Sequence, residues 1–452
     1  MFARVLVANR GEVAVRVIRA LHELEAEAVA VYSTADRDSL HVRLADRAVC
    51  LGPPPAVQSY LNIPSVIAAA ATTGCDAVHP GWGFLAENPA FVTACAENDL
   101  VFVGPTAEVM ARMGDKVRAK AELARAEVPL VPGTATAVEP ADARAAAAEL
   151  GFPILLKAAA GGGGKGMRLV ESEDELEGAF RMASAEAEAA FGDPSLYIEK
   201  LIHPARHVEI QVLADGHGSV LTLGERECSI QRRHQKLIEE SPSPALSSET
   251  REAMEAAAER AARAIDYRNA GTFEFLLGSD QRFYFIELNA RLQVEHPVSE
   301  LVTGIDLVRE QLRIAAGDAL SATGRAPRRG HAIEIRINAE DPLRDFAPTP
   351  GLITTFRPPL GPGVRLDTFV QEGYSVPPFY DSLLGKLIVW DENRPGALAR
   401  ALRALGELVI EGIPTTRAAA IEILRSEAFS SGRYSTSFLD ESGRRLASVR
   451  AE

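Results

Sequence analysis

The 452-residue sequence contains only four cysteines, and none of them is in Cys-x-x-Cys spacing. That spacing marks zinc sites and redox motifs, whereas a disulfide framework needs a shorter chain that is richer in cysteine. The sequence therefore argues against both, and we expect reduced thiols. Cys50, Cys75 and Cys95 are predicted to be small core residues, whereas Cys228 lies among polar residues and is predicted to be near a functional site.

Long apolar runs are also missing. No uninterrupted apolar segment reaches the roughly 18 residues of a membrane-spanning helix, and the N-terminus lacks the charged and apolar regions of a signal peptide. The net charge of -14 argues against nucleic-acid binding, which needs a basic surface to displace counterions from phosphates. We therefore expect a cytoplasmic protein that binds neither membranes nor nucleic acid.

Two common nucleotide-binding motifs are absent. The turn at residues 8–12, Ala-Asn-Arg-Gly-Glu, lacks the three glycines of a dinucleotide fingerprint, which argues against an NAD site. The run GGGGKG at residues 161–166 is not a Walker A loop, because Gly166 follows Lys165 where that motif has Ser or Thr. Consecutive glycines still let backbone N–H groups approach phosphate oxygens. We predict a hairpin tip that folds over a nucleotide as a lid; the alternative, a flexible linker, is disfavoured because strand-like segments flank the run.

Hydrophobic content of 47% and charged content of 24% are ordinary for a globular protein of several domains. Strands and helices alternate over residues 1–112, which predicts a Rossmann-like α/β domain with a parallel sheet. A central domain is predicted over residues 113–330, with a lid subdomain at about 131–203. Short strands, Pro-Gly turns and two late helices predict a mixed α+β domain over residues 331–452.

The segment TFEFLLGSDQRFYFIELN is predicted to be an antiparallel hairpin with Asp280 and Gln281 at the centre of its turn. Glu274 then faces Glu287, with Cβ atoms roughly 5 Å apart, and two like charges there need neutralisation. Mg²⁺ favours carboxylates together with nucleotide phosphates, so these glutamates and Asn289 predict a Mg-nucleotide site. The alternative is a solvated strand face with unrelated carboxylates.

Further polar clusters precede and follow this hairpin. The basic cluster QRRHQK at residues 231–236 is either a solvated face or, as we favour beside a carboxylate pair, an anion site. In the strand HAIEIRINAE, Glu334, Arg336 and Asn338 alternate with isoleucines, so one polar face is predicted to look into a cleft.

Taken together and in this order, the motifs MGDK, KAAAGGGGKGM, EKLIHPARHVEIQVLAD, ERECSIQRRHQK, GTFEF and ELNARLQVEHPVSE resemble the biotin carboxylase family of the ATP-grasp superfamily. The likeness extends from VANRGE to the final helices. Trp82 stands where many relatives have Tyr, and Ala86 where Ser is frequent; neither belongs to the catalytic set.

The resemblance implies an ATP-grasp central domain and carboxylation of biotin by bicarbonate with ATP, through carboxyphosphate. It implies that Glu295 is the base, that Arg336 stabilises the biotin enolate-like oxygen, and that bicarbonate lies between Lys236, Arg291, Gln293 and the Val294 backbone. Two Mg²⁺ or Mn²⁺ ions are implied at Glu274, Glu287 and Asn289. The nucleotide contacts that the resemblance implies are Lys116, Lys157, Gly163, Gly164, Glu199, Lys200, His207, Gln231, His234, Glu274 and Glu287.

The resemblance also implies partners: a separate biotin carboxyl carrier protein, a carboxyltransferase subunit of an acyl-CoA carboxylase of the acetyl-CoA or propionyl-CoA type, and a second copy in a homodimer. Carrier domains present their lysine in a Met-Lys-Met turn, and no Met here is adjacent to Lys. We therefore expect biotin to arrive on another chain. Two alternatives remain, another ATP-grasp ligase and a non-catalytic nucleotide-sensing subunit.

Overall fold

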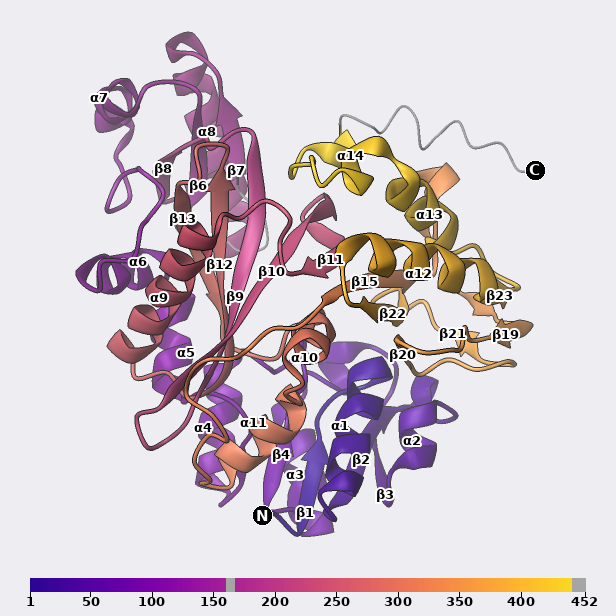
Figure 1. Ribbon diagram of the computed structural model, residues 1–452. Helices are drawn as coiled ribbons and strands as arrows, with labels where there is room; N and C mark the ends of the chain where they lie inside the picture. The colour runs from indigo at the N-terminus through magenta and orange to yellow at the C-terminus, as the bar shows by residue number, and fades with distance from the viewer. Residues whose placement is uncertain (160–166, 441–452) are drawn as a thin grey trace.

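The structure, a computed structural model, describes residues 1–159 and 167–440, without the side chains of residues 116 and 117. The predicted glycine hairpin tip at residues 161–166 lies outside the described residues. The N-terminal domain lies at one end of the molecule, a small subdomain projects at the other, and a large sheet lies between them (Figure 1).

The N-terminal domain is the predicted Rossmann-like unit, a parallel five-stranded sheet in the order β3-β2-β1-β4-β5. Most residues of its central strands are apolar and buried, because helices pack on both faces. Asn62 and Asn88 cap α3 and α4, each of which has proline in its first turn. The elements are β1 (Arg4–Val7), α1 (Gly11–Glu23), β2 (Glu27–Ser33), α2 (Leu40–Leu44), β3 (Arg47–Gly52), α3 (Ile63–Thr73), β4 (Ala77–His79), α4 (Pro89–Glu97) and β5 (Val101–Phe102).

The cysteine predictions are partly wrong. Cys95 is buried in the core of this domain, but Cys75 is half-buried and Cys50 is exposed on β3. β3 is the edge strand of the sheet and only partly covered, so the residue type alone did not determine burial.

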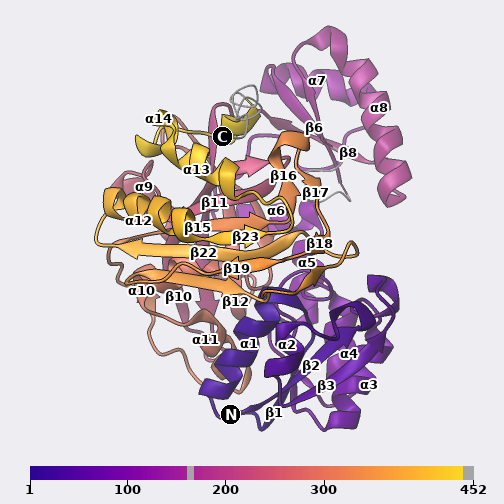
Figure 2. The ribbon, with the colours of Figure 1, turned by 90° about the vertical axis from the view of Figure 1, so that its right-hand side faces the viewer.

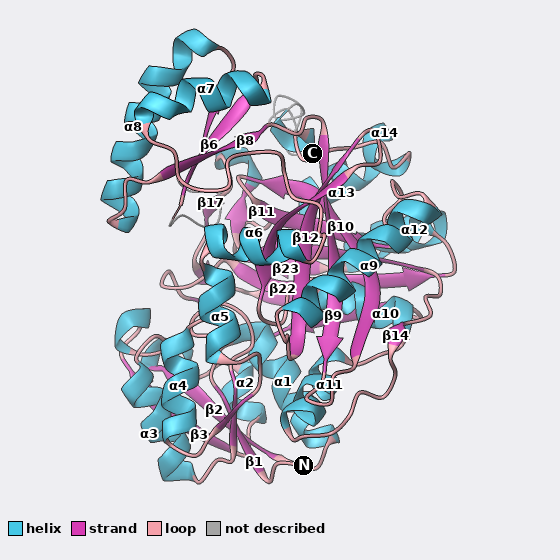
Figure 3. Cartoon of the chain, turned by 90° about the vertical axis from the view of Figure 1, so that its left-hand side faces the viewer, coloured by secondary structure: helices cyan, strands magenta, loops and turns pink. Residues whose placement is uncertain are grey.

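The projecting subdomain contains the antiparallel sheet β7-β6-β8 covered by two helices (Figures 2 and 3). An apolar stripe on α8, including Leu176, Phe180 and Ala183, packs on this sheet. α5 and α6 connect the subdomain to the N-terminal domain. The elements are α5 (Ala107–Gly114), α6 (Lys116–Arg125), α7 (Pro140–Leu150), β6 (Ile154–Ala158), β7 (Met167–Val170), α8 (Glu173–Phe191) and β8 (Leu196–Lys200).

The large sheet has the strand order β13-β12-β9-β10-β11-β15-β22-β20, with β14 beside β10. Its path crosses the predicted boundary at residue 330 without a break, since β15 pairs with β11. α9 covers β9 and β10 on one face, while α10 packs on β10, β11, β15 and β22. The elements are β9 (Ala205–Ala214), β10 (Val220–Arg232), β11 (Gln235–Ser241), α9 (Ser248–Ala264), β12 (Asn269–Gly278), β13 (Phe283–Asn289), α10 (His296–Thr303), α11 (Leu307–Ala315), β14 (Gly324–Arg325), β15 (His331–Asn338), β20 (Val364–Thr368) and β22 (Leu383–Asp391).

The C-terminal region completes the predicted α+β architecture. α12 packs on β15 and β22, and α13 and α14 follow it. Among the described residues, no helix is both long and apolar enough to cross a membrane. The remaining elements are β16 (Glu340–Asp341), β17 (Ala347–Pro348), β18 (Gly351–Leu352), β19 (Thr355–Arg357), β21 (Ser375–Val376), α12 (Arg394–Glu407), β23 (Val409–Glu411), α13 (Arg417–Arg425) and α14 (Glu427–Ser430).

Candidate active site

A row of charged side chains crosses four adjacent strands of the large sheet. Glu287 on β13 faces Glu274 on β12, Glu274 faces Glu209 on β9, and Glu209 faces Arg226 on β10. Successive strand residues point to opposite faces, so Phe273 and its equivalents fill the core under α9 while the glutamates share the other face. The sequence predicted the first pair and missed Glu209 and Arg226.

The register of the hairpin confirms the predicted pairing, but the predicted turn is wrong. A turn centred between Asp280 and Gln281 would pair Leu277 with the residue after Phe283. In the structure Leu277 pairs with Phe283 itself. A β-bulge at Ile286 shifts the later pairs by one residue and brings Glu287 opposite Glu274. The pairing of Glu274 with Glu287, the two carboxylates predicted to bind metal, therefore depends on the bulge as well as on the turn.

Lys236 enters this row from β11. Its Nζ donates to Glu209 Oε2 at 2.6 Å, to Glu274 Oε1 at 2.9 Å and to Glu295 Oε1 at 2.6 Å. Burial alone would lower the pKa of the Lys236 ammonium, but the three carboxylates outweigh burial and raise that pKa well above its usual value. Lys236 is thus a fixed cation among three acidic groups.

Arg226 is the member of the row on β10, and it holds Glu209 in place. It is fully buried, and its guanidinium donates to Glu209 Oε1 at 2.5 Å and to Gln211, Ser299 and Thr272. Burial would raise the pKa of Glu209, but Lys236 and Arg226 hold it well below its usual value. Glu209 therefore stays ionised and anchors Lys236.

Glu295 connects the row to the C-terminal region. It precedes α10 as the N-cap residue and is fully buried. Besides Lys236, its carboxylate accepts a hydrogen bond from Arg336 Nη2 at 2.9 Å. Burial opposes ionisation, yet Lys236 and Arg336 lower the pKa of Glu295 below its usual value. Arg336 comes from the polar face of β15, so the predicted cleft-facing strand does reach the predicted base.

Cys228 lies beside the same carboxylate. Its Sγ and carboxylate oxygens of Glu209 and Glu295 lie within 4.8 Å of one another, so the prediction that Cys228 is near the site is confirmed. Burial raises the pKa of the Cys228 thiol well above its usual value. The thiol therefore stays protonated and adds no negative charge to the row.

The segment between β13 and α10 places Arg291 beside these groups. Arg291 donates to Asn289 Oδ1 at 2.9 Å, to Gln293 Oε1 at 3.0 Å and, from Nε, to Glu87 Oε2 at 2.8 Å. Gln293 in turn donates to Glu274 Oε1 at 3.2 Å. Glu87 comes from the N-terminal domain, and no sequence pattern indicated that it contacts the site.

A second cluster lies between β6 and β8. Glu199 accepts from Lys157 Nζ at 2.6 Å and also pairs closely with Lys120, which the sequence reasoning missed. The chain before the subdomain ties this cluster to the large sheet, because Leu130 bridges to Phe285 and Gly133 to Glu199. Lys116, Gly163 and Gly164 were predicted here, but the glycines and the Lys116 side chain lie outside the described residues.

Other predicted nucleotide residues are more scattered. His207 contacts Glu274 Oε2 at 3.1 Å; burial would lower the pKa of His207, but Glu274 and Glu209 together outweigh burial and raise it to about 9. Lys200 instead donates to the carbonyls of Gly151 and Phe152, at the end of α7. His234 is exposed on the β10–β11 turn, and within the described ranges its side chain has no hydrogen bond or ion pair.

The basic cluster at residues 231–236 divides into two parts. Gln231 faces Lys236 across the β10–β11 pair, whereas Arg232 and Arg233 both pair with Asp345 outside the carboxylate row. Lys236 is therefore the member of the cluster that this structure brings to the row.

The donor set of the hairpin fits a divalent cation. Carboxylate and amide oxygens are the ligands that Mg²⁺ accepts, and Glu274, Glu287 and Asn289 offer them from one face of β12 and β13. A further group of possible ligands, His207, Glu209 and Glu274, lies within 4.8 Å. Carboxylates predominate on β12 and β13, and Lys236 adds a positive charge beside them. The site therefore suits a cation next to anionic substrates.

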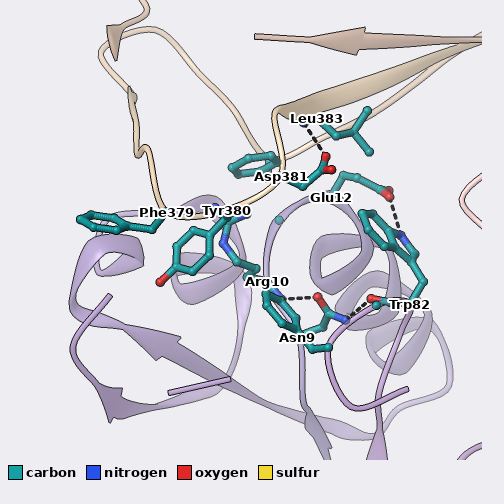
Figure 4. A pocket seen from close by; sticks show the side chains of 12 residues that line it. Asn9, Arg10, Glu12, Trp82, Phe379, Tyr380, Asp381 and Leu383 are labelled. Carbon is teal, nitrogen blue, oxygen red and sulfur yellow. Dashed lines mark hydrogen bonds between the residues drawn. The ribbon is translucent and has the colours of Figure 1, made fainter. Parts of the chain in front are cut away.

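A cavity of about 320 Å³ lies at the carboxyl end of β1 (Figure 4). Trp82 donates from Nε1 to Glu12 at 3.0 Å, and Phe84, Phe379 and Tyr380 form aromatic walls. Glu12 Oε2 lies 3.2 Å from Lys386 Nζ. Lys386 donates to the Val294 carbonyl at 2.8 Å and is the strand partner of Arg336. The HPGWGF loop therefore lines a cavity that Glu12 and Lys386 connect to the Val294 carbonyl, next to Glu295 in the sequence.

Comparison with known proteins agrees with this architecture. Residues 1–110 and 334–441 match the N-terminal and C-terminal domains of biotin carboxylase, and residues 115–323 match the ATP binding domain of the carbamoyl-phosphate synthase L chain. The chain is 53% identical to a biotin carboxylase of Nostoc sp., over 97% of this chain and 99% of that one. It is 51% identical to one of the subunits of pyruvate carboxylase from Methanothermobacter thermautotrophicus, over 98% and 90%.

Solved structures show the same likeness. A biotin carboxylase complex with β-γ-ATP from Campylobacter jejuni superposes with a TM-score of 0.95 at 47% identity, covering 98% of this chain and 99% of that one. The biotin carboxylase domain dimer of 2-oxoglutarate carboxylase from Hydrogenobacter thermophilus, solved with MgADP, ADP and bicarbonate, gives 0.94 at 44% identity and covers both chains completely. The chain belongs to the biotin carboxylase family.

Proposed function

We propose that this chain carboxylates biotin with bicarbonate and ATP, and that the biotin is attached to a separate carrier protein. The observation that supports this function best is the bridge from Lys236 through the buried Glu295 carboxylate to Arg336. One carboxylate is held between two cations there, where an anionic nucleophile and a second substrate can meet. The family membership and the bicarbonate in one relative's structure favour the same reaction.

Bicarbonate is a weak nucleophile that must approach a polyanion, so its attack needs positive charge and a base. We assign its binding to Lys236, Arg291, Gln293 and the Val294 backbone, and its deprotonation to Glu295. The lowered pKa keeps Glu295 ionised and able to accept a proton. Carboxyphosphate forms when the activated bicarbonate attacks the γ-phosphorus of ATP and ADP leaves, and the breakdown of carboxyphosphate releases CO2 and phosphate.

ATP is proposed to bind between the projecting subdomain and the large sheet. The residues proposed to hold it are Lys116, Lys157, Glu199, Lys200, His207, Gln231, His234 and the glycine run. Lys157 and Glu199 already lie together, and residues 130–133 link them to β13. Glu274, Glu287 and Asn289 would hold the divalent cations, which neutralise phosphate charge when bound. Closure of the glycine run would exclude water from carboxyphosphate, which otherwise hydrolyses.

The second substrate is proposed to enter through the aromatic cavity. Its aromatic walls suit the thioether ring of biotin, and the Glu12–Lys386 contact places the cavity next to the strand partner of Arg336. The phosphate released from carboxyphosphate would take the proton of the biotin nitrogen, and the Arg336 guanidinium would stabilise the charge that develops on the ureido oxygen. Carboxylation on that nitrogen completes the half-reaction.

Several wider assignments belong to this proposal. The carrier and the carboxyltransferase would be separate subunits of an acyl-CoA carboxylase, and the chain would act as a cytoplasmic homodimer. A relative of comparable identity is named as part of a pyruvate carboxylase, so the final carboxyl acceptor needs its own test. The chain would divide into three domains, with boundaries at residues 112 and 330.

The test is an ADP-release assay on the purified chain with a biotinylated carrier. Release that requires ATP, bicarbonate and biotin together, with carboxybiotin as product, is the expected result. ADP release that ignores biotin but requires another acceptor would indicate a different ATP-grasp ligase. Nucleotide binding without any turnover would indicate a sensing subunit.

A further inference from the structure

Two buried glutamates lie near Arg336, and the proposed reaction gives neither of them a role. Glu239 on β11 and Glu334 on β15 are directly opposed in the pairing of these strands, and both are 0% exposed. Opposed side chains on one face have Cβ atoms about 5 Å apart, where two ionised carboxylates destabilise a sheet. The pair therefore needs either a cation between its members or the loss of one charge.

The nearby cations give hydrogen bonds to only one member of the pair, Glu239. Arg336 donates from Nε to Glu239 Oε1 at 2.6 Å and from Nη2 to Glu295. Lys386 donates to the Val294 carbonyl and contacts Glu12. Throughout residues 1–159 and 167–440, no hydrogen-bond partner is found for Glu239 Oε2 or for either carboxyl oxygen of Glu334. Buried acceptors without partners are rare because each has lost its hydrogen bonds to water.

We propose that Glu334 is protonated in the folded enzyme and donates a hydrogen bond to Glu239 Oε2, which makes Glu239 the fixed carboxylate partner of Arg336. One proton removes the like-charge repulsion and gives both side chains a partner. The charged groups near Glu334 include both cations and carboxylates, so the cations do not leave a net positive charge that would keep Glu334 ionised. These groups are Glu239 and Lys236 on β11, Cys228 on β10, Lys386 on β22, Glu295 before α10 and Arg336 on the same strand.

The protonation equilibria point in the same direction. Burial, only partly opposed by Lys386, raises the pKa of Glu334 well above its usual value, and the Glu239 carboxylate adds to this effect. Burial also raises the pKa of Glu239 to about 7, despite the lowering effect of Arg336. Since Glu239 has the guanidinium as partner and Glu334 does not, Glu334 is the member that keeps the proton.

The arrangement has a role in the reaction, and this step rests on the proposed function. Glu295 shares Arg336 with Glu239, and its hold on the guanidinium weakens when it accepts the bicarbonate proton. Glu239 does not change partner, so it keeps Arg336 oriented toward the biotin oxygen. Were Glu334 ionised too, Arg336 would face three carboxylates, and less of its charge would be available to the substrate. Glu239 is a positioning residue, and Glu334 limits the negative charge around Arg336.

The first experiment needs no activity. Above the usual glutamate pKa, Glu334 retains in the folded protein a proton that it has released in the unfolded chain, so the contribution of Glu334 to stability falls as pH rises toward neutrality. Glu334→Gln keeps an N–H donor and cannot titrate. The melting temperature of this variant should therefore fall less than that of the wild type between pH 5 and 8. The difference, variant minus wild type, should become more positive as the pH rises. Parallel melting curves would overturn the proposal.

The second experiment separates positioning from folding. Glu239→Gln and Glu334→Leu should each lower biotin-dependent turnover about tenfold, with the KM for ATP and the biotin-independent ADP release changed less than about twofold. Glu334→Gln should recover most of the loss of Glu334→Leu, because its amide restores the donor. Equal losses for Gln and Leu at position 334 would contradict the shared proton.

A matched control is available on the same strand. Glu240 is equally buried but points to the opposite face, where it accepts from His331 and Arg394 at 2.6 Å. Glu240→Gln should lower the melting temperature without reducing biotin-dependent turnover selectively. A wild-type chain without biotin-dependent ADP release would refute the proposed function, whereas the melting curves at different pH would still decide the protonation of Glu334.

Discussion

Replacing Glu295 by glutamine is the sharpest test of the chemistry, because it preserves the shape of the side chain and removes its ability to accept a proton. Glu295 is fully buried and accepts from Lys236 at 2.6 Å and from Arg336 at 2.9 Å. A glutamine keeps one carbonyl oxygen for one cation and turns an amide donor toward the other. The variant therefore changes both the base and the local charge balance.

The two effects have different sizes. A general base contributes on the order of 10²–10⁴-fold, so biotin-dependent kcat should fall roughly 100-fold or more. One buried charge-assisted hydrogen bond is lost, which should cost about 2 kcal/mol of stability. The cost stays at this level because Lys236 keeps Glu209 and Glu274, and Arg336 keeps Glu239. Lys157 and Glu199 are untouched, so the KM for ATP should change less than about threefold.

The assay is bicarbonate- and biotin-dependent ADP release, with thermal unfolding measured on the same preparations. Glu240→Gln serves as the control, since Glu240 is also a buried carboxylate with His331 and Arg394 as partners. It should destabilise the protein to a similar degree and leave kcat nearly unchanged. Near-normal turnover of folded Glu295→Gln, or an equal loss in both variants, would refute the assignment of Glu295 as the base.

Other parts of the chain offer three more tests. Valine at both Gly163 and Gly164 should raise the KM for ATP about tenfold with little change in melting temperature, because Cβ branches hinder the approach of N–H groups to phosphate; unchanged ATP kinetics would make the run a spacer. Streptavidin should not detect this chain after co-expression with a biotin ligase, and free biotin should be a poorer substrate than a biotinylated carrier in carboxylation assays. Burial lowers the pKa of His41 from 6.5 to about 4, so between these values the unfolded chain binds a proton that the folded protein does not, and stability falls as pH drops. His41→Gln should reduce that loss by at most about 2 kcal/mol, measured as urea unfolding at pH 7 and pH 5.

Local sequence patterns were sufficient for several parts of the fold and site. Strand alternation placed Glu274 and Glu287 on one face of a hairpin, and the same two-residue period turned Arg336 toward a polar interior. Both faces follow from the spacing of residues along one strand, although the pairing of Glu274 with Glu287 also needs the bulge at Ile286. The parallel sheet of residues 1–112 was predictable for a similar reason, since its strands and helices alternate regularly.

Other features depend on the order of the strands in the sheet, which no local pattern contains. Glu209 and Arg226 meet because β9 lies between β12 and β10, and their alternating polar positions also fit a solvated face. Glu87 reaches Arg291 from another domain, across 204 positions of sequence. The bulge at Ile286 is a local irregularity that the turn composition did not indicate.

The uninterrupted large sheet has a consequence for dissecting this enzyme into fragments. A chain cut at residue 330 would separate β11 from β15 and expose a row of unpaired N–H and C=O groups on each piece. Such open edges pair with other chains, so both fragments should aggregate when they are made separately. When the fragments are co-expressed, each edge is the natural template for the other, and the recovered complex should regain the Lys236 and Arg336 contacts to Glu295 only where β11 and β15 find their native register.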